Sequence, residues 1–220
     1  MSMRSEPFDD VRQDDLAIDG RGLPVRHERL RRQLEFSLIA DRLKGVERRT
    51  LLVDGSRREN AAEHSWHLAL LALLLEEHGP GRLDRLRVLE LVIVHDLVEV
   101  EAGDTFAYDE EALPEQEERE RRAADALFGR LPGDQAARLR RLWDEFEARE
   151  TPEARFAKAL DRIQPVLANF ATGGHSWRLH EVARSQVLAR MEPVRDASET
   201  LWRYVVLLVD EGTERGWLRP

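Results

Sequence analysis

The chain contains no cysteine among its 220 residues. This absence excludes disulfide bonds, cysteine-ligated iron–sulfur clusters and thiol catalysis. Long apolar runs are missing as well: the stretches Leu68–Leu75 and Leu91–Val94 are far too short to cross a bilayer. The first residues are polar and lack the apolar core of a signal peptide. We therefore expect a cytoplasmic protein with no membrane partner.

An excess of positive charge is also lacking. Lys and Arg number 34 against 43 Asp and Glu, so the formal net charge is −9. An acidic chain repels a phosphate backbone, so we expect no nucleic-acid partner. A small phosphorylated substrate remains compatible, because a metal ion and one or two arginines can reverse the field locally.

Alternating Val, Ile and Thr residues that would indicate a sheet are absent, and helical spacing of apolar residues dominates. Gly79-Pro80-Gly81 is a helix stop signal, and Thr151-Pro152 is a helix start signal. We predict an all-α fold of about six to eight helices in one domain over residues 27–216, after a loosely ordered arm at residues 1–26. The expected helices span residues 27–43, 61–78, 83–102, 114–130, 132–150 and 151–170, followed by a mostly helical stretch to residue 216. Residues 45–60 are expected to interrupt the helices around a turn at Asp54-Gly55.

The dipeptide His95-Asp96 lies near the end of the most apolar predicted helix. A buried charge there is costly unless it is paired or binds a metal ion. Glu99 follows His95 by four residues and would share its face of a continuous helix. Asp104 comes directly after Gly103, where that helix is expected to end. Taken alone, this pattern is equally compatible with a structural His–Asp pair and incidental surface acids.

Two further polar residues occur on other predicted helices. His64 opens the second helix, and Asp161 lies in the apolar pattern of the sixth, where it could instead pair with Lys158 or Arg162. Two imidazoles and two carboxylates form a mixed ligand set that suits Mn, Co, Fe or Zn. Four protein ligands leave open positions on an octahedral ion, which favours Mn or Co. His67, one helical turn after His64, is expected to pack or to support the site rather than to bind the ion.

These residues, in this order, resemble the HD-domain metal-dependent phosphohydrolase superfamily and, within it, the 5′-deoxynucleotidase branch. The resemblance covers about residues 30–170. The motifs that carry it are RRENAAEHS at residues 57–65, HDLVE at 95–99, GD at 103–104 and ALD at 159–161.

The resemblance implies a helical fold, one divalent metal ion and hydrolysis of nucleoside 5′-monophosphates. Its metal ligands would be His64, His95, Asp96 and Asp161, and its catalytic carboxylates Glu99 and Asp104. Arg49, fifteen residues before His64, matches an arginine that contacts the substrate phosphate.

The resemblance leaves several points open. Relatives often carry a tryptophan where this chain has Thr50, so a preference for deoxyribose does not carry over. Either Glu99 or Asp104 could be the acid or the base, and Fe, Zn, Ni and Mg remain alternative metals. Another phosphate ester, such as a cyclic nucleotide, ppGpp or a non-nucleotide compound, remains an alternative substrate. A metal-binding regulatory protein without turnover is a further alternative. Relatives are often dimeric, which implies a homodimer, and the apolar stretch Leu201–Val209 is a candidate interface.

Overall fold

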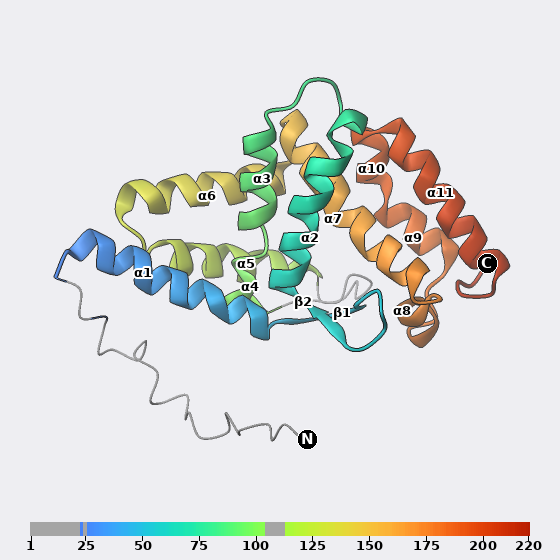
Figure 1. Ribbon diagram of the computed structural model, residues 1–220, viewed down its shortest axis with the longest axis horizontal. Helices are drawn as coiled ribbons and strands as arrows, with labels where there is room; N and C mark the ends of the chain where they lie inside the picture. The colour runs from blue at the N-terminus through green and yellow to red at the C-terminus, as the bar shows by residue number, and fades with distance from the viewer. Residues whose placement is uncertain (1–22, 24–25, 104–112) are drawn as a thin grey trace, which may run out of the picture.

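The computed structural model describes residue 23, residues 26–103 and residues 113–220. These residues form helices and one small sheet, which confirms the predicted all-α class (Figure 1). The α-helices are α1 (Glu28–Asp41), α2 (Ala61–Leu75), α3 (Arg85–Val94), α4 (Glu99–Ala102), α5 (Leu113–Phe128), α6 (Gly133–Ala148), α7 (Pro152–Ala171), α8 (His175–Leu179), α9 (Arg184–Arg190), α10 (Glu192–Ala197) and α11 (Glu199–Glu214). The remaining elements are the 3-10 helices η2 (Arg42–Gly45) and η3 (Glu76–His78) and the strands β1 (Glu47–Leu51) and β2 (Arg58–Asn60). The number of helices exceeds the prediction because α4, α8, α9 and α10 are short pieces that the apolar pattern does not separate.

Helix α7 is the central element. It runs behind α2 and α3 in Figure 1, with α1, α5 and α6 at one end of the molecule and α8 to α11 at the other. It contacts α2, α3, α6, α10 and α11, as well as β1. Apolar residues such as Phe156, Leu160 and Ile163 are buried along it, and so are the polar residues Asp161 and Gln164. The most enclosed helix therefore brings two polar side chains into the core.

Capping residues set the starts of the helices that position the predicted ligands. Asn60 caps α2, where its side-chain oxygen accepts a hydrogen bond from Glu63 N at 2.9 Å and its own N–H donates to the Glu63 carboxylate at 3.1 Å. Asp84 caps α3, and Thr151 caps α7 with Pro152 in the first turn. Each cap satisfies backbone N–H groups that the first turn of a helix leaves without a partner. The start of α2, and with it the place of His64, is thus set by local sequence.

The predicted helix over residues 83–102 is wrong in one respect, because α3 ends at Val94 and a turn separates it from α4. In that turn Leu97 N bonds to Val94 O at 3.1 Å, and Glu99 N bonds to Asp96 O at 3.0 Å. The His95 ring nitrogen Nδ1 lies 2.9 Å from Val92 O, the carbonyl that Asp96 N would use in a continuing helix. A side chain that takes this carbonyl competes with the helical hydrogen bond, so the chain turns here.

Residues 45–60 also differ from the expected irregular segment. They contain an antiparallel hairpin in which Glu47 pairs with Asn60 and Leu51 with Arg58, with an irregular register between these pairs. The turn falls at the expected place, and Gly55 has a φ of 72°, a left-handed conformation that glycine adopts without steric cost. The strands are too short for an alternating apolar pattern to reveal them.

The C-terminal apolar stretch packs mainly within the molecule. Leu201, Val205 and Val209 of α11 are buried, whereas Tyr204 and Leu207 are exposed. The predicted interface over residues 201–209 therefore retains only the outer side of α11. Among the described residues, no helix is both long and apolar enough to cross a bilayer.

Candidate metal centre

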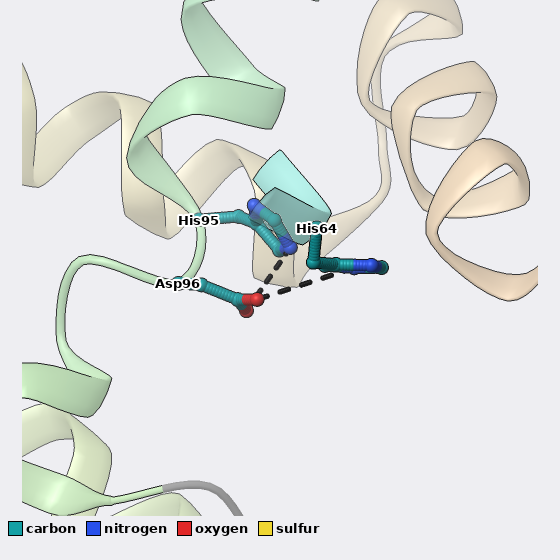
Figure 2. A group of neighbouring side chains, drawn as sticks. All are labelled: His64, His95 and Asp96. Carbon is teal, nitrogen blue, oxygen red and sulfur yellow. Dashed lines mark ion pairs between the residues drawn. The ribbon is translucent and has the colours of Figure 1, made fainter. Parts of the chain in front are cut away.

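Three separate elements bring the four predicted ligands together. His64 lies in the first turn of α2, His95 and Asp96 follow α3, and Asp161 lies in the middle of α7. All four are buried, and His64 is completely inaccessible. Figure 2 shows His64, His95 and Asp96 side by side, with ion pairs that link Asp96 to both imidazoles.

The distances within the cluster suit a shared ion. His64 Nε2 lies 3.1 Å from Asp161 Oδ1 and 4.0 Å from Asp96 Oδ2. His95 Nε2 lies 3.0 Å from Asp96 Oδ1 and 3.9 Å from Asp161 Oδ1. One ligand atom from each of His64, His95 and Asp96 lies within 4.8 Å of the others. Ligand atoms each about 2 Å from one ion would be separated by comparable distances.

The second nitrogen of each imidazole has a partner that leaves Nε2 for the ion. His95 Nδ1 donates to Val92 O at 2.9 Å, and His64 Nδ1 donates to the side-chain oxygen of Gln164 at 3.0 Å. Among the described residues, His95 Nε2 is a buried atom with no hydrogen-bond partner. A buried nitrogen in this state, facing carboxylate oxygens, fits a metal ligand. The donor set therefore fits a divalent cation.

The electrostatics agree with this interpretation. Burial lowers the pKa of His64 to about 4, so its ring is neutral near pH 7 and can offer a lone pair. Burial also lowers the pKa of His95, but the neighbouring Asp96 carboxylate outweighs it and leaves that pKa above its ordinary value. The carboxyl groups of Asp96 and Asp161 have pKa values well below their usual range, because cationic neighbours outweigh burial. Both aspartates are therefore ionised near pH 7 and can offer oxygen ligands, and protons compete with a metal ion for the imidazole of His95.

Comparison with known proteins agrees with this geometry. The family model described as HD domain matches residues 40–202. The chain belongs to the HD-domain family. A relative in Homo sapiens, 5′-deoxynucleotidase HDDC2, is 30% identical over 135 residues, which cover 61% of this chain and 65% of that protein. A relative in Schizosaccharomyces pombe, 5′-deoxynucleotidase hdd1, is 28% identical and covers 59% of this chain and 66% of that one. The chain therefore aligns with slightly less than two thirds of each of these proteins.

Solved structures support the same family. The chain is 50% identical to a predicted metal-dependent phosphohydrolase from Magnetospirillum magnetotacticum, with a TM-score of 0.82, and the match covers 90% of this chain and 99% of that one. A conserved hypothetical protein from Pyrococcus furiosus is 23% identical with a TM-score of 0.56, covering 82% and 99% of the two chains, and shares the fold. The family and the His/Asp cluster together support a divalent metal ion.

Sequence reasoning missed Arg48, which lies against the HD-domain cluster. Its Nη1 is 3.1 Å from Asp96 Oδ2, and its Nε is 3.8 Å from Glu59 Oε2. Successive side chains of a strand point to opposite sides, so β1 directs Arg48 inward and leaves Arg49 exposed. A strand predicted over residues 47–51 would have indicated that Arg48 and Arg49 face opposite sides.

Sequence reasoning also missed Gln164 and Glu59, because residue type alone does not distinguish a buried Gln or Glu from an exposed one. Gln164 Nε2 donates to Glu59 Oε1 at 2.7 Å and lies 3.2 Å from His67 Nδ1. Burial raises the pKa of Glu59 to about 7, and Arg48 opposes this shift. His67 therefore contacts Gln164, the residue whose side-chain oxygen accepts the hydrogen bond from His64. This contact is compatible with the supporting role expected for His67.

Two of the three remaining predicted site residues, Glu99 and Arg49, border a cavity of about 620 Å³ that opens onto the cluster. Glu99 is buried and lines this cavity. The prediction that Glu99 shares a continuous helix with His95 is wrong, because Glu99 belongs to α4. Arg49 and Thr50 line the same cavity from β1. Asp104 lies outside the described residues. Trp143 and Phe146 contribute apolar surface to the wall.

Proposed function

We propose that this protein is a metal-dependent phosphohydrolase that releases phosphate from nucleoside 5′-monophosphates. The observation that carries the proposal is the buried His95 Nε2, which faces carboxylate oxygens beside a cavity and has no hydrogen-bond partner among the described residues. The volume of about 620 Å³ falls within the range of small-molecule sites and far exceeds the needs of a phosphate ion alone. The names of the 5′-deoxynucleotidase relatives support a nucleotide substrate.

The ion would be held by His64, His95, Asp96 and Asp161, with Mn or Co favoured. When bound, a divalent ion supplies Lewis acidity that lowers the pKa of water and shields a phosphoryl oxygen. The mixed nitrogen and oxygen donors suit such an ion better than one that prefers thiolates.

The other residues of the site would bind the phosphate and move protons. The carboxylate of Glu99 is placed at the cavity wall, where it can accept or return a proton. Asp104 is proposed for the complementary proton transfer, as the family resemblance implies. The guanidinium of Arg49 would hold the substrate phosphate at the mouth of the cavity, because a planar guanidinium matches phosphate oxygens in pairs.

A metal-supplemented screen of phosphate release tests the proposal. Nucleoside 5′-monophosphates should be cleaved in preference to cyclic nucleotides, ppGpp and non-nucleotide phosphomonoesters. Thr50 lines the cavity where relatives often carry tryptophan, so we expect little discrimination between ribose and deoxyribose. Absence of phosphate release from every monophosphate, with the metal bound, would leave the regulatory alternative.

The homodimer implied by the relatives remains a proposal. Light scattering at micromolar protein concentration should show twice the mass of the 25.4 kDa chain. A mass equal to that of one chain would contradict it.

A further inference from the structure

Three arginines line the wall between the main cavity and a smaller pocket beside it. Arg149 follows the last residue of α6, Arg162 belongs to α7, and Arg190 ends α9. Each of the three borders both hollows, and the smaller one has a volume of about 380 Å³. The tertiary structure thus gathers three guanidinium groups from separate helices at one edge of the proposed active site.

This edge lies next to the metal centre. Arg162 directly follows Asp161 in the sequence, and its Nη1 lies 3.5 Å from Asp161 Oδ2. Lys158 also approaches that oxygen, with its Nζ at 3.7 Å, so the outer side of Asp161 faces cations. All three arginines line the cavity that His95, Asp96 and Asp161 also line. An anion bound by the arginines and a phosphate at the metal centre could therefore belong to one substrate molecule.

Local acids do not account for all of this charge. Within the described part of the chain Arg149 forms no ion pair, and its Nε donates to the backbone oxygen of Glu147 at 3.2 Å. Acidic residues line both hollows: Glu192 and Asp196 line the smaller pocket, and the main cavity wall includes Asp144, which pairs with Arg140, and Glu147, which pairs with Lys158. On its cavity side, the arginine edge is therefore suited to an anion from outside the protein.

The backbone of Arg149 adds an independent observation. Arg149 caps α6 in the left-handed conformation, with φ 56° and ψ 30°. Glycine is the usual residue at this kind of helix end, since any other side chain raises the energy of that conformation. Residues held in such conformations are common at ligand sites, where the side chain has a role that glycine could not fill.

We infer that Arg149, Arg162 and Arg190 form a second anion subsite, which binds a second phosphate group of the substrate while the metal centre holds the phosphate to be cleaved. The inference rests on the proposed function and extends its substrates from nucleoside 5′-monophosphates to nucleotides that carry a second phosphate. The second phosphate can be attached to the sugar, as in a nucleoside 3′,5′-bisphosphate, or can extend the 5′ chain, as in a 5′-diphosphate. A guanidinium binds either with paired hydrogen bonds.

The test is the affinity gained from the second phosphate, measured by calorimetry on metal-loaded protein in the Glu99→Gln background. Three probes are titrated: a nucleoside 5′-monophosphate, its 3′,5′-bisphosphate and its 5′-diphosphate. At least one two-phosphate probe should bind about tenfold more tightly than the monophosphate, and Arg149→Gly should remove most of that ratio. The probe that gains affinity identifies where the second phosphate is attached. If a probe is cleaved during titration, the same ratio is taken from kcat/KM.

The variant and its control exploit the two non-glycine residues with positive φ among the described residues. Arg149→Gly relieves a strained backbone, so its unfolding temperature should be unchanged or higher, and a lost ratio would then reflect the missing guanidinium. Glu181, with φ 49°, is exposed and lies outside both hollows, so Glu181→Gly should keep the ratio.

Three results would overturn the inference. The second phosphate could add no affinity, the ratio could survive Arg149→Gly, or all probes could weaken by the same factor, which would place Arg149 at the cleaved phosphate. A ratio that behaves as expected in a protein that releases no phosphate would instead reject the proposed hydrolysis and keep the subsite.

Discussion

The side-chain oxygen of Gln164 lies 3.0 Å from His64 Nδ1, and this contact selects which nitrogen of His64 can face a metal ion. The amide cannot easily turn over, because its nitrogen donates to the Glu59 carboxylate at 2.7 Å. With the oxygen held toward His64, the Nδ1 atom must carry the proton, and Nε2 keeps a lone pair toward Asp161. A residue that would not touch the ion itself thus orients one of its proposed ligands.

Replacing Gln164 with leucine should weaken metal binding while the protein remains folded. The change removes the acceptor for His64 Nδ1–H, and loss of such a partner typically costs about 10–100-fold in metal affinity. Chelator competition measures the dissociation constant directly. Gln135→Leu is a matched control, because Gln135 accepts a long-range hydrogen bond from Gln33 at 2.8 Å on α6, away from the centre. Equal metal affinities in the two variants would contradict the prediction.

The ligand and proton-transfer roles should separate experimentally. Elemental analysis of protein purified without chelator should find close to one transition-metal ion per chain, and Asp161→Ala should lose both the ion and activity. Glu99→Gln should retain the ion and slow turnover by about 10²–10⁴-fold, the usual effect of removing a positioned acid or base. Asp104→Asn is expected to behave like Glu99→Gln. Full activity in both carboxylate variants would reject the mechanism.

The two neighbouring arginines of β1 should have different effects. Arg48 contacts Asp96 at 3.1 Å, so Arg48→Met should lower metal affinity and kcat together. Arg49 is exposed at the cavity, so Arg49→Ala should mainly raise KM for a monophosphate and leave metal affinity intact. Steady-state kinetics combined with metal titration separates the two outcomes. The same pattern in both variants would argue against opposite orientations along the strand.

An ion pair between α1 and α6 should make part of the stability depend on acidity. The two Arg29 Nη atoms donate to the two Asp134 oxygens at 2.7 Å each, and this pair lowers the pKa of Asp134 to about 2. A lowered carboxyl pKa stabilises the fold above the unfolded value of 3.8, and this contribution is lost as the pH falls toward 2. Carboxyl NMR titration should show the low pKa and its return toward 3.8 in Arg29→Gln. Because both residues are exposed, high salt should reduce the shift.

The sequence by itself determined the helical class and most helix starts. Apolar residues at helical spacing need a shared core, and caps such as Asn60 and Thr151 act within a few residues of the chain. It also indicated four candidate ligands, because His64, His95, Asp96 and Asp161 lie in apolar surroundings or match a family motif. Their chemical types are readable without a structure.

Only the tertiary structure decided how these residues meet. It brought His95, just after α3, to Asp161 of α7, with His95 Nε2 at 3.9 Å from Asp161 Oδ1. It also turned Arg48 rather than Arg49 toward Asp96, through a strand too short to produce a pattern. Gln164 became a partner of His64 across 100 residues of chain. The contact of Gln164 with His64 depends on the packing of α2 against α7, and that of Arg48 with Asp96 on the packing of β1 beside the end of α3; no local propensity or spacing contains that information.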